Sequence, residues 1–115
     1  MHWPFSDLVS LIRARHSFGR MEGFYVNLAS WETSPLSTAV YGFQFDDAEE
    51  FDEEAGVPKV AADLGLRTLL VVSNLEDVVL DTLVSDSQAR LEDYIEAVNY
   101  YREFDSFKPF KPRAG

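Results

Sequence analysis

The stretch Thr38-Ala-Val-Tyr-Gly-Phe-Gln-Phe45 has the period-two side-chain alternation of a β-strand. Its larger apolar residues fall on one face, together with Ala39, and Val40 falls on the other. The earlier stretch Gly23-Phe-Tyr-Val-Asn-Leu-Ala29 alternates in the same way. Because only a short turn-like segment, residues 30–37, separates the two stretches, they are expected to pair as an antiparallel ribbon.

A third strand and three helices complete the predicted fold. Residues 67–72 form an apolar run of β-forming residues, typical of a strand buried on both faces. Helical spacing of apolar residues predicts one helix over about 7–17, one after Asn74 and one over about 88–104. The sequence thus predicts an α+β fold, with a mostly antiparallel sheet of about three strands (23–29, 38–45, 67–72), an N-terminal helix and two C-terminal helices in a single domain over 1–107, followed by a basic, proline-containing tail over 108–115.

Composition restricts the possible partners and compartments. A chain of 115 residues with 46% hydrophobic residues can bury one core. The lack of cysteine excludes disulfides and thiolate zinc sites. No apolar segment reaches about 18 residues, so we expect no membrane partner. No secretory signal is visible, so we expect a cytoplasmic location. The net charge of −10 argues against direct nucleic-acid binding, while the oligomeric state stays open.

The negative charge is concentrated directly after the second predicted strand, in Asp46-Asp-Ala-Glu-Glu-Phe-Asp-Glu-Glu54. Seven of these nine residues are carboxylates and none is basic. We expect an acidic loop, over 46–54, that projects from a sheet edge. It is either a surface that binds a cationic partner or a solvated loop that keeps the protein soluble.

No pattern indicates catalysis or a metal site. A calcium loop of the EF-hand type that began at Asp46 would have Ala48, Phe51 and Val57 at its third, sixth and twelfth positions, so the match fails. Neither His2 nor His16 lies in a recognisable catalytic context. We therefore expect no enzyme activity, no cofactor and no bound metal.

Several motifs together resemble a known family. The motifs are the acidic run, Ala62-Asp-Leu-Gly-Leu66, Leu75-Glu-Asp-Val-Val79 and Leu91-Glu-Asp-Tyr-Ile-Glu-Ala-Val-Asn-Tyr-Tyr101. In this order, over residues 38–107, the chain resembles small acidic bacterial immunity proteins that are encoded beside polymorphic toxins, including those of contact-dependent growth inhibition. The resemblance implies that the chain binds and neutralises a cognate toxin, often a basic nuclease.

This resemblance and the charge pattern together predict a partner-binding site. Its carboxylates would contact Lys and Arg of the toxin, and Phe51 would be an apolar anchor among them. The predicted site comprises Asp46, Asp47, Glu49, Glu50, Phe51, Asp52, Glu53 and Glu54.

The alternative is an adaptor domain that docks through its aromatic C-terminal helix. Tyr94, Tyr100, Tyr101 and Phe104 lie in that helix, and Phe107 follows it. Most of these rings are expected to pack in the core, and an exposed subset would bind a partner.

Overall fold

The computed structural model of the chain describes residues 1–44 and 50–109. It is an α+β domain, so the predicted fold class, with an N-terminal helix and two C-terminal helices, is confirmed. The described elements, in chain order, are β1 (His2–Pro4), α1 (Phe5–Arg13), β2 (Gly23–Val26), α2 (Leu28–Thr33), the 3₁₀ helix η1 (Pro35–Ser37), β3 (Ala39–Gly42), β4 (Phe51–Asp52), β5 (Val57–Pro58), α3 (Lys59–Asp63), β6 (Arg67–Val71), α4 (Val72–Ser85) and α5 (Leu91–Phe104).

The main sheet has four antiparallel strands in the order β1-β3-β2-β6. The expected pairing of the two alternating stretches is present as β2 against β3, with Tyr25 opposite Tyr41. β1 adds a fourth strand on the outer side of β3, where His2 also lies opposite Tyr41. Its three residues are too few to show a period of two, so no sequence pattern predicts it.

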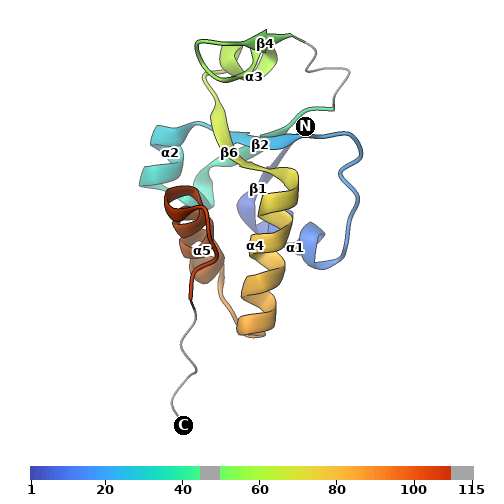
Figure 1. Ribbon diagram of the computed structural model, residues 1–115, viewed down its shortest axis with the longest axis vertical. Helices are drawn as coiled ribbons and strands as arrows, with labels where there is room; N and C mark the ends of the chain where they lie inside the picture. The colour runs from blue at the N-terminus through green and yellow to red at the C-terminus, as the bar shows by residue number, and fades with distance from the viewer. Residues whose placement is uncertain (45–49, 110–115) are drawn as a thin grey trace.

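One face of the sheet packs on α1, α4 and α5 (Figure 1) and forms the main core. Phe24 and Val26 of β2, both fully buried, point into this core. The apolar stripes of α1, α4 and α5 supply most of the rest, at helical spacing. The members from these three helices are Phe5, Leu8, Val9, Ile12, Leu75, Val78, Val79, Tyr94, Ile95, Ala97 and Val98.

β6 is an edge strand, and both its first and its last residue are exposed. The expectation of burial on both faces therefore fails at its ends. The register shifts between Phe24 and Tyr25, so that Phe24 lies opposite Leu70 and Tyr25 lies opposite Thr68. This β-bulge allows the adjacent Leu69 and Leu70 to enter the same core, although side chains normally alternate between faces.

The opposite face of the sheet carries a second cluster, which holds a small lobe formed by β4, β5 and α3. Figure 1 shows this lobe across the sheet from α1, α4 and α5. Tyr25 of β2 packs there with Val57, Ala61 and Leu66, and all four are buried. Because most of its charged residues are acidic, residues 50–66 are called the acidic lobe.

The structure differs from prediction at α2, because the predicted strand 23–29 includes residues 28 and 29, which are helical. The Asn27 side chain accepts a hydrogen bond from the Ser30 backbone N–H at 3.0 Å, which caps a short helix. Trp31 of this helix is 1% exposed and joins the main core. The apparent alternation that continued to Leu28 was thus misleading.

The two C-terminal helices also begin at other residues than predicted. α4 starts at Val72, directly after β6. α5 starts at Leu91, because the Arg90 backbone N–H donates to Asp93 Oδ2 at 2.8 Å in a capping arrangement. No helix in the two described segments is long and apolar enough to cross a membrane.

A hydrogen bond between buried Trp31 and Asn99 ties α2 to α5, with Trp31 Nε1 and Asn99 Oδ1 2.8 Å apart. Replacing Asn99 with Leu leaves the indole N–H without its acceptor. We expect the free energy of unfolding to fall by about 1–3 kcal/mol. Denaturant unfolding measures this change, and Asn99→Asp, which keeps an acceptor, is the control. Equal losses in both variants would contradict the assigned role of the bond.

Candidate functional site

The predicted binding residues lie on the acidic lobe and on the segment before it. Asp46, Asp47 and Glu49 lie outside the described residues, as does Phe45 of the predicted strand 38–45. The other five site residues belong to a hairpin, in which β4 pairs with β5. The expectation of a plain loop from a sheet edge is therefore wrong for this half of the run. β3, the strand that precedes the run, is an interior strand between β1 and β2.

Asp52 stabilises the turn of this hairpin. Its Oδ1 accepts a hydrogen bond from the Ala55 backbone N–H at 2.9 Å, and its backbone oxygen accepts one from the Gly56 N–H at 2.8 Å. Gly56 has a φ of +71°, a conformation that favours glycine. The Asp52 carboxylate is thus partly engaged within the chain, unlike the two glutamates that follow.

The solvent-facing part of the hairpin combines acidic and apolar groups. Phe51 is 60% exposed, an unusually open position for a phenylalanine. Glu53 and Glu54 in the turn are exposed, and so is Glu50. The Lys59 ammonium lies 3.7 Å from a Glu50 carboxylate oxygen, but both side chains are more than half exposed, so this ion pair is weak. Glu50, Phe51, Glu53 and Glu54 are called the hairpin surface.

Aromatic side chains of the sheet region pack under the lobe that carries the hairpin surface. Tyr25 belongs to the cluster that contains the lobe's buried apolar residues, and Tyr41 and Phe43 pack against that cluster. The ring of Tyr25 lies 5.9 Å from that of Phe43, which stacks in turn on Tyr41 at 6.4 Å. A Cβ on Gly23 would lie 3.1 Å from the Tyr25 hydroxyl, so the absence of a side chain at Gly23 leaves room for the tyrosine. The hairpin is thus held by a packed base.

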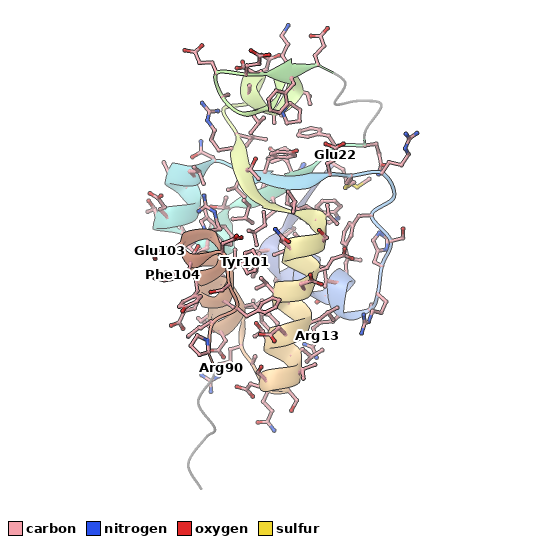
Figure 2. The ribbon with its side chains drawn as sticks, in the orientation of Figure 1. Arg13, Glu22, Arg90, Tyr101, Glu103 and Phe104 are labelled. Carbon is pink, nitrogen blue, oxygen red and sulfur yellow. The ribbon has the colours of Figure 1, made fainter. Side chains whose placement is uncertain are left out.

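Burial raises the pKa of Tyr25, and the negative charge of Glu22 raises it further. Figure 2 shows Glu22 on the side of the sheet that faces the lobe. The phenol therefore stays neutral, as its packed position requires. Sequence patterns identified Tyr25 as a strand residue and did not indicate that it supports the lobe.

The alternative binding surface lies at the C-terminal end of α5, where Figure 2 shows Tyr101 and Phe104. The Tyr100 and Phe104 rings are 4.5 Å apart, and those of Tyr101 and Phe107 are 5.7 Å apart. Phe104 is 55% and Phe107 46% exposed. Tyr94, in contrast, lies in the core. Phe104 and Phe107 are therefore the most exposed aromatic residues at this end of α5.

The described residues bring no metal-ligand set together. Within 1–44 and 50–109, no three His, Asp or Glu side chains are grouped closely enough to hold a metal ion. The hairpin surface and the aromatic end of α5 are both suited to protein contacts, because they combine exposed rings with charged neighbours.

We expect the raised pKa of Tyr25 to make stability fall at alkaline pH. The unfolded chain loses the Tyr25 proton near pH 10, whereas the folded chain retains it to higher pH. The contribution of the neutral phenol to the free energy of unfolding is therefore complete below about pH 10 and is lost above it. In Tyr25→Phe the fall in unfolding free energy above about pH 10 should be smaller. Denaturant unfolding across this range, with tyrosinate absorbance followed in parallel, measures both effects. An unchanged alkaline fall in the variant would refute the assignment.

Comparison with known proteins gives one family match. The family described as "Domain of unknown function (DUF7716)" matches residues 6–110, which includes the main sheet except β1, the acidic lobe and all the helices except the first residue of α1. No curated protein and no solved structure matches the chain. Because the match covers most of the sequence, the chain belongs to the DUF7716 family.

Proposed function

We propose that this protein is an immunity protein that binds and neutralises a basic bacterial toxin, of which a nuclease is the leading example, through its acidic lobe. It acts by occupying a cationic surface and catalyses nothing itself. The proposal combines the resemblance of residues 38–107 to immunity proteins with the chemistry of the hairpin surface. It applies to the described residues Glu50, Phe51, Glu53 and Glu54, and it extends along the sequence to Asp46, Asp47 and Glu49.

The observation that carries the proposal is the exposure of Phe51 among carboxylates. Phe51 is 60% exposed, so its ring offers apolar area that a partner can bury. The neighbouring glutamates would pair with Lys or Arg of the partner around it. An apolar anchor surrounded by polar contacts is typical of binding hot spots. The packed base under the lobe supports the proposal further, because a fixed hairpin loses little conformational freedom on binding.

Charge also favours a cationic partner on kinetic grounds. A nuclease must be basic where it binds phosphates, and a concentrated negative surface raises its rate of encounter with an inhibitor. Asp52 is expected to contribute less than Glu53 and Glu54, because one of its oxygens already accepts the Ala55 N–H.

The first test neutralises the three glutamates as Glu50→Gln/Glu53→Gln/Glu54→Gln. We expect association with the cognate toxin domain, which the proposal places at the basic C-terminal end of a large protein encoded immediately upstream, to slow by about tenfold at low salt. The difference should shrink as salt increases. Stopped-flow or surface-based kinetics measure it. The control Glu76→Gln/Asp77→Asn/Asp81→Asn removes the same charge from α4 and should retain most of the rate. Equal slowing in both variants would show that only the total charge matters.

The second test removes the anchor. In Phe51→Ala we expect the dissociation constant for the same toxin domain to rise by roughly 30-fold, which corresponds to about 2 kcal/mol, mainly through faster dissociation. Calorimetric titration measures the constant, and growth of cells that express the toxin measures protection. Because Phe51 is exposed, the variant should fold normally. Wild-type affinity and full protection in this variant would refute its role.

A second candidate function is an adaptor that docks through the end of α5. The exposure of Phe104 and Phe107 favours it. Binding would then be nearly insensitive to salt, would survive neutralisation of the hairpin surface and would be lost in Phe104→Ala. The same binding experiments therefore separate the two functions.

A further inference from the structure

A groove runs between α5 and the segment where α2 meets η1. Its volume is about 440 Å³, within the usual range for ligand sites. The α5 residues of the groove share one face of the helix, because they follow Glu92 at intervals of three, four and seven residues. The lining consists of Thr33, Ser34, Pro35 and Leu36 on one wall and Glu92, Ile95, Glu96 and Asn99 on the other.

The middle of the groove is apolar. Leu36 is 49% exposed on one wall, and Ile95 forms apolar surface on the other at 8% exposure. Polar groups of the first wall are used within the chain: the Thr33 hydroxyl donates to the Ala29 carbonyl at 2.8 Å, and the Ser34 carbonyl accepts from the Thr38 hydroxyl at 2.9 Å. The groove can therefore receive an apolar side chain without leaving these groups unpaired.

The rim of the groove is acidic. Glu92 and Glu96 are one helical turn apart on α5, and both are exposed. A second hollow of about 410 Å³ adjoins the groove at Asn99, which lines both. The charged residues of this second hollow are Glu32, Arg102 and Glu103. Since four carboxylates and one guanidinium line the two hollows together, their combined charge favours a cationic occupant.

One cation already lies at this rim. The Lys108 ammonium is 2.7 Å from Glu96 Oε1, and the lysine side chain is only 26% exposed. The chain reaches this position because it turns back after α5, at Asp105 with its left-handed backbone, and runs alongside the helix (Figure 1). Glu96 therefore accepts an ammonium group in a short, charge-assisted contact.

The walls are held in place independently of any ligand. The hydrogen bond between Trp31 and Asn99 joins α2 to α5 beside the groove, and Trp31 is anchored in the main core. A groove formed in advance loses little free energy to reorganisation when a peptide binds.

We propose that this groove binds a peptide segment of a partner protein in which one apolar side chain lies between two Lys or Arg residues. The apolar side chain packs between Leu36 and Ile95, and the cations pair with Glu92 and Glu96. This surface is separate from the hairpin surface, and the proposal does not depend on the function of the acidic lobe.

The test uses the full chain and a library of nine-residue peptides with Lys or Arg at positions 3 and 7 and Leu, Val or Phe at position 5. We expect library members to bind, with affinity falling at least about tenfold in Glu92→Gln/Glu96→Gln and a similar loss in Leu36→Ser. Lys108→Ala should bind about two- to fivefold more tightly, because it releases Glu96 for the peptide. Fluorescence anisotropy of the labelled peptides measures each constant.

A matched control removes the same charge from the acidic lobe. Glu53→Gln/Glu54→Gln should bind the peptides as the wild-type chain does. Failure of every library member to bind, equal losses in the lobe and groove variants, or weaker binding by Lys108→Ala would each overturn the proposal. Because Leu36, Glu92 and Glu96 are exposed, these variants should retain the fold, which circular dichroism verifies.

Discussion

The structure depends on the burial of β2 on both faces. All four residues of this strand are buried, although the strand belongs to a small antiparallel sheet that could have left one face to water. Phe24 and Val26 join the helices, while Tyr25 joins the lobe. One strand therefore connects the main core to the second cluster. The position of the acidic lobe, and of every group on it, follows from this shared strand.

Much of the fold could be predicted because its signals are local. The alternation around Tyr41 encodes a strand, and the apolar stripe of α5 encodes a helix and its buried face. For β3 the alternation did not give the buried face, because Val40 and Gly42, opposite Tyr41, are the buried residues. β1 and α2 carry no comparable signal. β1 is only three residues long and exists because β3 offers it hydrogen bonds from far along the chain. The start of α2 depends on one side-chain cap at Asn27, in a stretch whose apolar spacing also fits a strand.

The candidate site could be found by composition, but its geometry could not. A density of carboxylates has low strand propensity, so nothing local indicated that Phe51 and Asp52 would form β4. Because of this pairing and its own side-chain hydrogen bond, Asp52 supports the turn of the hairpin, whereas Glu53 and Glu54 face solvent. The groove beside α5 was also invisible in the sequence, because its walls come from segments more than fifty residues apart and meet only through tertiary packing.

Two acidic surfaces on one small domain would suit the binding role proposed for this protein. The lobe and the groove lie on different elements, and each joins carboxylates to exposed apolar groups. Because β2 contributes to both clusters, a partner bound to the lobe would be held at a defined orientation to the main core. With two separate surfaces, binding at the hairpin surface and binding at the groove could change independently of each other.

Amide hydrogen exchange of the protein, measured with and without the proposed cognate toxin domain, tests whether the hairpin surface is the binding site. We predict that complex formation slows exchange at backbone amides of the hairpin formed by β4 and β5, with little change in β1 or α4. Slowed exchange confined to the end of α5, with the hairpin amides unaffected, would contradict it.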